Sequence, residues 1–243
     1  MTSDDTRRRE LRDNLAALRA RIAAACEVAG RSPDEVTLVA VTKTFPASDV
    51  ALLHGLGVHD IGENRDQEAA PKAAETAGLR PPLRWHFVGQ LQANKVKSVV
   101  RYADVIHSVD RMKLIEVLGT RARAARRRIT CLVQVDLDEV ASESVSGARG
   151  GAPPAEVPGL ADAIAAQEGL VLGGVMAVAP LGEPPRPAFR RLAEVAAHVR
   201  AVHHGAVMIS AGMTGDLEEA IAEGATHVRV GTALLGGRAP LVR

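Results

Sequence analysis

The chain has 243 residues, of which 47% are hydrophobic, and a formal net charge of +1, which indicates a globular protein with an ample core. Balanced charge and an aromatic content of 2% argue against nucleic acid as a partner, because phosphate backbones attract basic surfaces and unpaired bases stack on aromatic rings. No apolar run approaches the ~20 residues of a membrane-spanning helix and the first residues lack a signal peptide's apolar block, so we expect a cytoplasmic protein with no membrane partner.

The first predicted element is an amphipathic helix. Leu11, Leu15, Leu18 and Ile22 recur at helical spacing among charged residues, and a stop follows at Gly30 and Pro33. We expect residues 1–35 to form a helix packed on a barrel of residues 36–243, with one domain overall.

From Val36 onward, short apolar segments alternate with Ala-rich helical patterns. Strands are predicted at residues 36–42, 58–62, 84–88, 104–107, 130–136, 170–176, 206–210 and 226–230. They lack a polar face, as expected of a parallel sheet covered on both sides. Eight such βα units predict an α/β fold, a single (β/α)8 TIM-like barrel. An open doubly wound sheet is the competitor, but no Gly-rich dinucleotide fingerprint follows the first strand.

Residues 138–158 interrupt this alternation. The segment is rich in Ser, Gly and Pro and has no periodicity, so it predicts a loop. After the fifth strand it would lie on the carboxyl-terminal rim, where it is either a lid or a linker.

Lys43 closes the first predicted strand. It is one of only five lysines among 30 basic residues, so this chain uses arginine wherever charge alone suffices. Arginine does not lose its proton in a protein, whereas a desolvated lysine can become a free amine that condenses with a carbonyl to form a Schiff base. The alternative is a lysine that merely extends from a strand end into solvent.

A barrel would bring the other strand ends to the same pocket. They carry these candidate residues: Asn64, His86, Met176, Ser210 and Arg229. The last two turns, at 210–215 and 231–232, are Gly-rich, and such turns often bind phosphate in barrels. Alternatively they are tight connections in which Thr214 and Thr232 cap helices. Asp216, Glu218 and Glu219 would repel a phosphate that they faced, so we expect them to point to solvent.

A strand-end lysine beside a phosphate site indicates pyridoxal 5′-phosphate (PLP). An arginine at position 229 facing the pyridine nitrogen would keep that nitrogen unprotonated and make the ring a weaker electron sink. Arg229 could equally be an interior arginine paired with an acid. Neither the histidines nor the two cysteines, Cys26 and Cys131, show metal-ligand spacing, so no metal site is predicted.

Taken together, seven segments resemble the pyridoxal phosphate homeostasis protein family. They are residues 39–43, 61–68, 85–95, 107–110, 174–177, 210–216 and 228–233, and the resemblance runs in order from about residue 11 to 238. It implies a barrel similar to the N-terminal domain of alanine racemase, with Lys43 as the Schiff-base lysine and Arg229 at the pyridine nitrogen. It further implies these contacts: Ser210, Thr214, Gly231 and Thr232 at the phosphate, and Asn64, His86 and Met176 around the ring.

The resemblance implies a carrier and regulator of vitamin B6 with no catalytic residue, a monomer whose PLP can pass to apo PLP-dependent enzymes. A racemase built on this barrel needs a second acid or base from another domain, and only about a dozen residues follow the eighth strand, so we expect no such domain. Two alternatives remain open: a PLP-dependent amino-acid racemase or decarboxylase, and a Schiff-base aldolase acting on a sugar phosphate.

Two departures from the family matter. Many relatives have a second lysine where this chain has Phe45, and a Ser-Lys-Ser-Gly stretch where this chain has residues 148–151. Arg149 would replace that lysine there. Because an arginine cannot accept the aldehyde of the cofactor, we expect binding and release without a second lysine.

Overall fold

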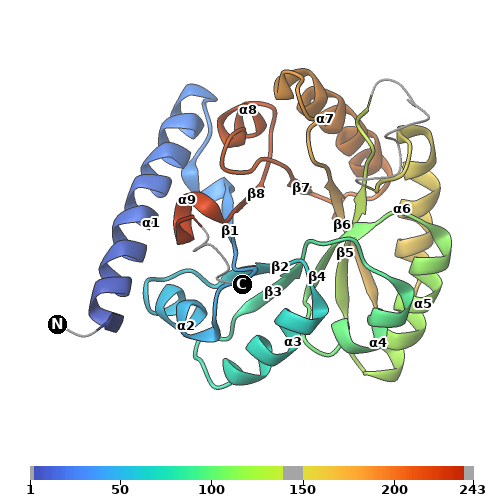
Figure 1. Cartoon of the computed structure of the whole chain (residues 1–243). Helices are drawn as coiled ribbons and strands as arrows, with labels where there is room; N and C mark the ends of the chain where they lie inside the picture. The colour runs from blue at the N-terminus through green and yellow to red at the C-terminus, as the bar shows by residue number, and fades with distance from the viewer. Residues whose placement is uncertain (1–2, 139–149, 238–243) are drawn as a thin grey trace.

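The computed structural model describes residues 3–138 and 150–237. Eight parallel strands close into a barrel in chain order, and β1 pairs with both β2 and β8 (Figure 1). The strands are β1 Thr37–Val41, β2 Asp60–Glu63, β3 Arg84–Phe87, β4 Val105–Val109, β5 Ile129–Gln134, β6 Leu170–Met176, β7 Met208–Ser210 and β8 His227–Val230. Each lies on a segment predicted as a strand, so the predicted fold, a single (β/α)8 barrel with an extra N-terminal helix, is confirmed.

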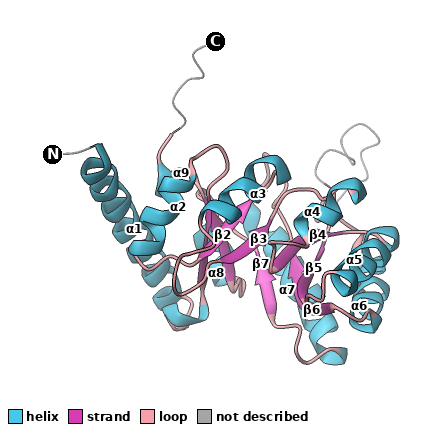
Figure 2. Ribbon diagram, turned by 90° about the horizontal axis from the view of Figure 1, so that it is seen from below, coloured by secondary structure: helices cyan, strands magenta, loops and turns pink. Residues whose placement is uncertain are grey.

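Helices surround the strands, as Figure 2 shows in cyan around the magenta barrel. They are α1 Ser3–Val28, α2 Ala47–Gly55, α3 Asp66–Glu75, α4 Val96–Val99, α5 Met112–Ala124, α6 Val157–Ala166, α7 Pro185–Val202, α8 Leu217–Ala222 and α9 Thr232–Leu235. Among the described residues, none of these helices has both the length and the apolar character that crossing a bilayer takes.

Helix α1 packs on one side of the barrel. Its four predicted apolar residues are all buried, and it contacts α2, α8 and α9 (Figure 1). The chain then turns at Gly30, which adopts φ 66°, a conformation that costs a glycine little.

Two apolar layers separate strands from helices. One lies under α1, α2, α8 and α9 around β1, β2 and β8, and the other covers β3 to β7. Inside the barrel is a third, small group that we call the apolar interior cluster: Val105, Leu132, Met176 and Met208. Close packing of this kind is usual inside a barrel of eight strands.

The predicted loop at 138–158 is shorter at its C-terminal end than expected. Ala152 pairs with Val135 in an isolated bridge, a 3-10 turn covers Pro154–Glu156, and α6 begins at Val157. The prolines at 153, 154 and 158 indicated a loop, but a proline is well tolerated in the first turn of a helix. Arg149 and the rest of 139–149 lie outside the described residues.

Candidate functional site

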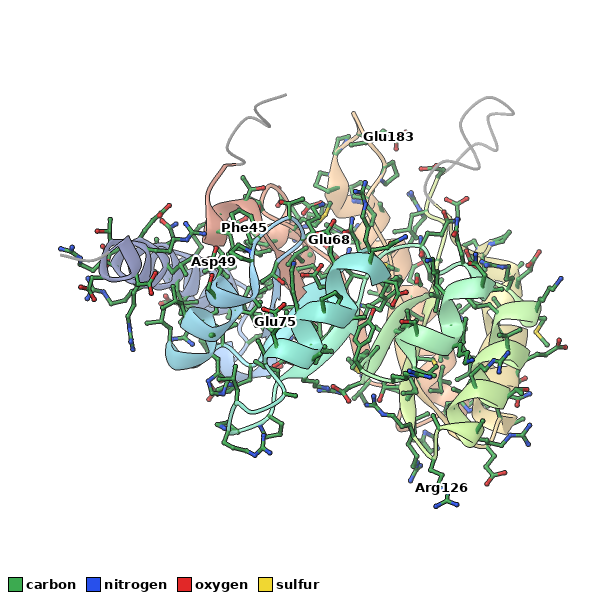
Figure 3. The ribbon with its side chains drawn as sticks, turned by 60° about the horizontal axis from the view of Figure 1, so that its bottom comes forward. Phe45, Asp49, Glu68, Glu75, Arg126 and Glu183 are labelled. Atoms are coloured by element: carbon green, nitrogen blue, oxygen red, sulfur yellow. The ribbon has the colours of Figure 1, made fainter. Side chains whose placement is uncertain are left out.

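A cavity of about 730 Å³ lies where the carboxyl ends of β1, β2, β3 and β8 meet the turn after β7. Six of the nine predicted site residues line it: Lys43, Asn64, Thr214, Arg229, Gly231 and Thr232. In Figure 3, Phe45 and Glu68 mark this edge of the barrel, and Arg126 marks the opposite edge. Phe45 also lines the cavity, and the Arg7 guanidinium stacks over its ring at 5.5 Å.

The backbone on both sides of Lys43 is fixed by side chains from β2 and α3. The buried Thr42 donates its hydroxyl to Glu63 at 2.6 Å, and its carbonyl accepts from the Lys72 ammonium at 2.8 Å. On the other side, the Thr44 N–H donates to the Glu68 carboxylate at 2.7 Å, with Thr44 at φ 70°. A positive φ is costly for a β-branched residue, so the Glu68 contact helps to hold the turn that presents Lys43.

Lys72 and Glu63 form an ion pair of 2.6 Å beneath this turn, and Glu63 is fully buried. Burial raises the pKa of Glu63, although the bonds from Lys72 and Thr42 oppose that rise. Sequence reasoning missed this pair and Glu68. The signal was present, since Lys72 is another of the five lysines in a chain that otherwise uses arginine.

Asn64 follows β2 and lines the cavity. Its Oδ1 is buried and has no hydrogen-bond partner among the described residues. Gly89, just after the neighbouring strand β3, is a glycine for steric reasons. A Cβ at Gly89 would lie 2.2 Å from the Asn64 carbonyl oxygen, too close for any side chain.

The turns after β7 and β8 form the far wall. Met213, Thr214 and Gly215 line the cavity from one turn, and Gly231 and Thr232 from the other. In α9 the N–H groups of Leu234 and Leu235 donate to the Gly231 carbonyl, which leaves those of Thr232 and Ala233 without an acceptor within the helix. A Cβ at Gly231 would crowd the Val41 carbonyl at 3.0 Å. The turns therefore offer backbone donors and little steric bulk, as an anionic group requires.

The acidic residues beside these turns are engaged elsewhere. Asp216 accepts from the Met213 N–H at 2.6 Å, and Glu218 pairs with Arg21 of α1 at 2.8 Å. Glu218 remains 44% exposed, and α1 provides it with a partner that local sequence could not reveal. No carboxylate lines the cavity among the described residues, whereas Lys43 and Arg229 do.

Arg229 is a buried cation on β8, only 6% exposed. Its Nη1 donates to the Ser210 hydroxyl at 2.7 Å and its Nη2 donates to the Ala177 carbonyl at 2.9 Å. Burial lowers the pKa of Arg229 to about 10, so the group stays charged at neutral pH. Two of its five N–H donors are used by these bonds, which leaves donors for a ligand acceptor.

Three predicted residues do not line the cavity. Met176 belongs to the apolar interior cluster. His86 and Ser210 are both buried, and their polar atoms bond inside the barrel, His86 to Asp60 and His107, and Ser210 to His107 and Arg229. An inward-facing residue at a strand end was indistinguishable from a cavity residue in sequence, since strand periodicity gives the face but not the depth.

The remaining histidines and the cysteines stay structural in character. His198 and His204 contact carbonyls of α7 and His203 contacts Asp162, while Cys26 and Cys131 are buried and free. Within residues 3–138 and 150–237, no group of three or more His, Cys, Asp or Glu side chains is arranged to hold a metal.

Residues 14–239 match the family model of the alanine racemase N-terminal domain. A pyridoxal phosphate homeostasis protein of Mycobacterium tuberculosis is 44% identical over 250 residues, covering 96% of this chain and 94% of that protein. PipY of Synechococcus elongatus, solved with PLP bound, superposes with a TM-score of 0.79 at 33% identity, covering 93% of this chain and all of PipY. Alanine racemase of Streptomyces coelicolor shares the fold, with a TM-score of 0.70 at 20% identity over 92% of this chain and 59% of the racemase.

Proposed function

The chain belongs to the pyridoxal phosphate homeostasis proteins within the alanine racemase N-terminal domain family, and from that premise we propose that it binds PLP in the cavity lined by Lys43 and Arg229 and serves PLP homeostasis. The observation that carries the proposal is the pairing of these two cations with the small turns at 213–215 and 231–232, with no lining carboxylate among the described residues. PLP is an anion with an aldehyde, and this wall composition suits both properties.

Lys43 is the proposed attachment point. Its amine would condense with the aldehyde that PLP supplies when bound, with water as the other product. The ion pair of Lys72 with Glu63 and the Glu68 contact to Thr44 orient the backbone from which Lys43 extends. Lys72 itself is committed to Glu63 and Thr42, so it is a poor competitor for the aldehyde.

The phosphate would be held by the turns of the far wall. Thr214, Gly231 and Thr232 line that side of the cavity, and their backbone N–H groups and the two hydroxyls would be the donors. Ser210 was expected to share this role, but its hydroxyl is bonded to Arg229 and His107, so its contribution would pass through Arg229.

Arg229 would face the pyridine nitrogen. A fixed guanidinium disfavours a second positive charge on that nitrogen, which makes the ring a weak electron sink and favours holding the cofactor over using it. His86 and Met176 were expected around the ring. Both lie in the barrel interior, so we assign the ring contacts to Asn64 and the apolar Val41 and Val178, which line the cavity.

Borohydride trapping tests the proposal. Purified protein incubated with PLP and then reduced should carry a stable adduct on Lys43 in peptide mass mapping, and Lys43→Ala should carry none. Lys97→Ala is the matched control, since Lys97 is an exposed lysine, and it should retain the adduct. Absence of an adduct in the parent protein, or an adduct on another lysine, would overturn the proposal.

The enzymatic alternatives rest on fold alone, because the alanine racemase of Streptomyces coelicolor is only 20% identical to this chain. Turnover of amino acids or sugar phosphates by the PLP-loaded protein, lost in Lys43→Ala, would establish one of them. Transfer of PLP to apo PLP-dependent enzymes, a monomeric state and a cytoplasmic location are further parts of the proposal, which co-incubation with an apo enzyme, sedimentation and cell fractionation would test.

A further inference from the structure

Five side chains form a continuous hydrogen-bonded line through the barrel interior. Arg229 Nη1 bonds the Ser210 Oγ at 2.7 Å, and that oxygen lies 2.9 Å from His107 Nδ1. His107 Nε2 lies 2.9 Å from His86 Nδ1, and His86 Nε2 lies 2.8 Å from Asp60 Oδ1. The line begins at the cavity and ends at Asp60, the first residue of β2 at the opposite end of that strand.

The Asp60 end sets the direction of the bonds when both rings are neutral. An ionised carboxylate can only accept, so His86 donates to Asp60 from Nε2, and its Nδ1 is left to accept from His107 Nε2. His107 Nδ1 then accepts from the Ser210 hydroxyl, whose oxygen accepts from Arg229. In this arrangement each ring carries one proton, on Nε2.

The surroundings of the two rings agree with neutrality. Burial lowers the pKa of His86, although Asp60 opposes this, and it lowers the pKa of His107 well below the usual value, with His86, Arg229, His227 and Arg84 adding to that effect. Burial alone would raise the pKa of Asp60, but the hydrogen bond from His86 and the charges of His86, Arg84 and His227 together outweigh it, and the pKa ends below the usual value. Arg84, Asp104 and His227 are the other charged or titratable groups that act on these rings.

Arg229 needs a counterion that it does not have at contact. Among the described residues it forms no ion pair, and Asp216 is the one acid that acts on it at longer range. An uncompensated buried charge is costly. Hydrogen bonds must therefore hold the guanidinium in place, and three polar side chains connect it to Asp60, which is 23% exposed at the amino-terminal end of the barrel.

We propose that Asp60, His86, His107 and Ser210 form a one-way hydrogen-bond chain that positions Arg229. These are positioning residues, since none of them lines the cavity. The consequence for the ligand rests on the proposed function: an Arg229 held in this way would offer its free N–H donors to the pyridine nitrogen of bound PLP.

The chain can be tested without any cofactor. In protein labelled with 15N-histidine, long-range 1H–15N spectra report the tautomer and charge of each ring. His86 and His107 should be neutral and protonated on Nε2 between pH 6 and 8. Protonation of either ring in that range, or an Nδ1–H form of either, would overturn the proposal.

Asp60→Asn then tests the control exerted by the acid. An asparagine that donates its N–H₂ to His86 Nε2 reverses the chain, so both rings should move toward the Nδ1–H form. Asp162→Asn is the matched control, because His203 and Asp162 form a His–Asp contact of the same 2.8 Å length on the outer surface. It should leave the spectra of His86 and His107 unchanged. Unchanged tautomers in folded Asp60→Asn protein would contradict the proposal, and the parent spectra decide it if that variant does not fold.

Measurements of PLP release and of the visible absorption band test whether the chain affects ligand binding. Asp60→Asn and His86→Gln should still form the Lys43 adduct but release PLP faster, by about tenfold for the loss of roughly 1.4 kcal/mol, with a shifted visible band. Asp162→Asn should match the parent. If the parent forms no Lys43 adduct, the proposed function fails while the tautomer result stands. If the adduct forms but release and spectrum match the parent in both variants, the positioning role fails.

Discussion

The barrel interior holds two regions that differ in kind, although they come from the same strands. On β4, Val105 belongs to the apolar interior cluster and His107, two residues later, belongs to the polar line; on β7, Met208 and Ser210 divide in the same way. Residues two apart share a face of a strand, so all four point inward. The comparison teaches that inward-facing positions near the carboxyl ends are polar where each donor meets an acceptor, and apolar elsewhere.

The two regions stabilise the fold differently. The apolar cluster gains from burial, about 1.5–3 kcal/mol for each large side chain. A hydrogen bond in the polar line adds only ~1 kcal/mol, but a partner left unpaired there costs more than the bond was worth. The apolar region should therefore respond to lost volume and the polar region to lost partners or to added protons.

The largest effect is expected in the apolar region. Leu132 is fully buried, and Leu132→Ala should lower the free energy of unfolding by about 2–5 kcal/mol through lost burial and the cavity left behind. Urea denaturation with an unchanged m-value would measure it. Leu181→Ala is the control, since Leu181 is 83% exposed, and it should change stability by less than about 0.5 kcal/mol. Equal effects in the two variants would contradict the packing of this cluster.

The polar region should be sensitive to acid. Burial lowers the pKa of His227 to about 4 from 6.5, and its ring lies 6.2 Å from that of His86. The unfolded chain therefore binds more protons than the folded one between these values, so stability is full above pH 6.5 and falls as the pH drops. The loss attributable to His227 should reach about 3 kcal/mol by pH 4.

Urea unfolding between pH 7.5 and 4 would measure this slope. His227→Gln should flatten it, whereas His204→Gln, which changes an exposed histidine, should leave it as in the parent. A slope that His227→Gln does not alter would show that this ring is protonated without cost.

The smallest effect is expected for a substitution at Met176. Because Met176 packs in the apolar interior cluster and not on the cavity wall, Met176→Leu should cost less than about 1.5 kcal/mol and leave the PLP dissociation constant unchanged. Unfolding and equilibrium dialysis would measure the two quantities. Weaker PLP binding at unchanged stability would return Met176 to the ring site that the family resemblance implies.

Most of the fold could be predicted from the sequence, because buried parallel strands are short apolar runs that stand out between helical patterns. It also identified Lys43, Asn64, Arg229 and the two Gly-rich turns, since strand ends and turns are local features. How deeply a side chain is buried, in contrast, depends on residues that are distant in the sequence. His86 and Ser210 were recognised as polar strand-end residues, but their partners Asp60 and His107 come from other strands, and only strand register brings them together.

The same limit applies to the support of Lys43. The Glu63–Lys72 pair joins residues nine apart across a turn and a helix, and the contact of Glu68 with Thr44 spans 24 residues. Nothing in the local pattern distinguishes these acids from solvent-exposed ones. The rarity of lysine in this chain was the usable sign, and it points to Lys72 as it does to Lys43.

Helix α1 carries a consequence for the far wall of the cavity. Its side chains bond three carbonyls there: Arg21 that of Thr214, Asn14 that of Leu234 and Arg7 that of Leu235. The first segment of the chain thus braces the last two turns, although no residue of α1 lines the cavity. Sequence changes at Arg7, Asn14 or Arg21 belong with the cofactor site when variants of this protein are interpreted.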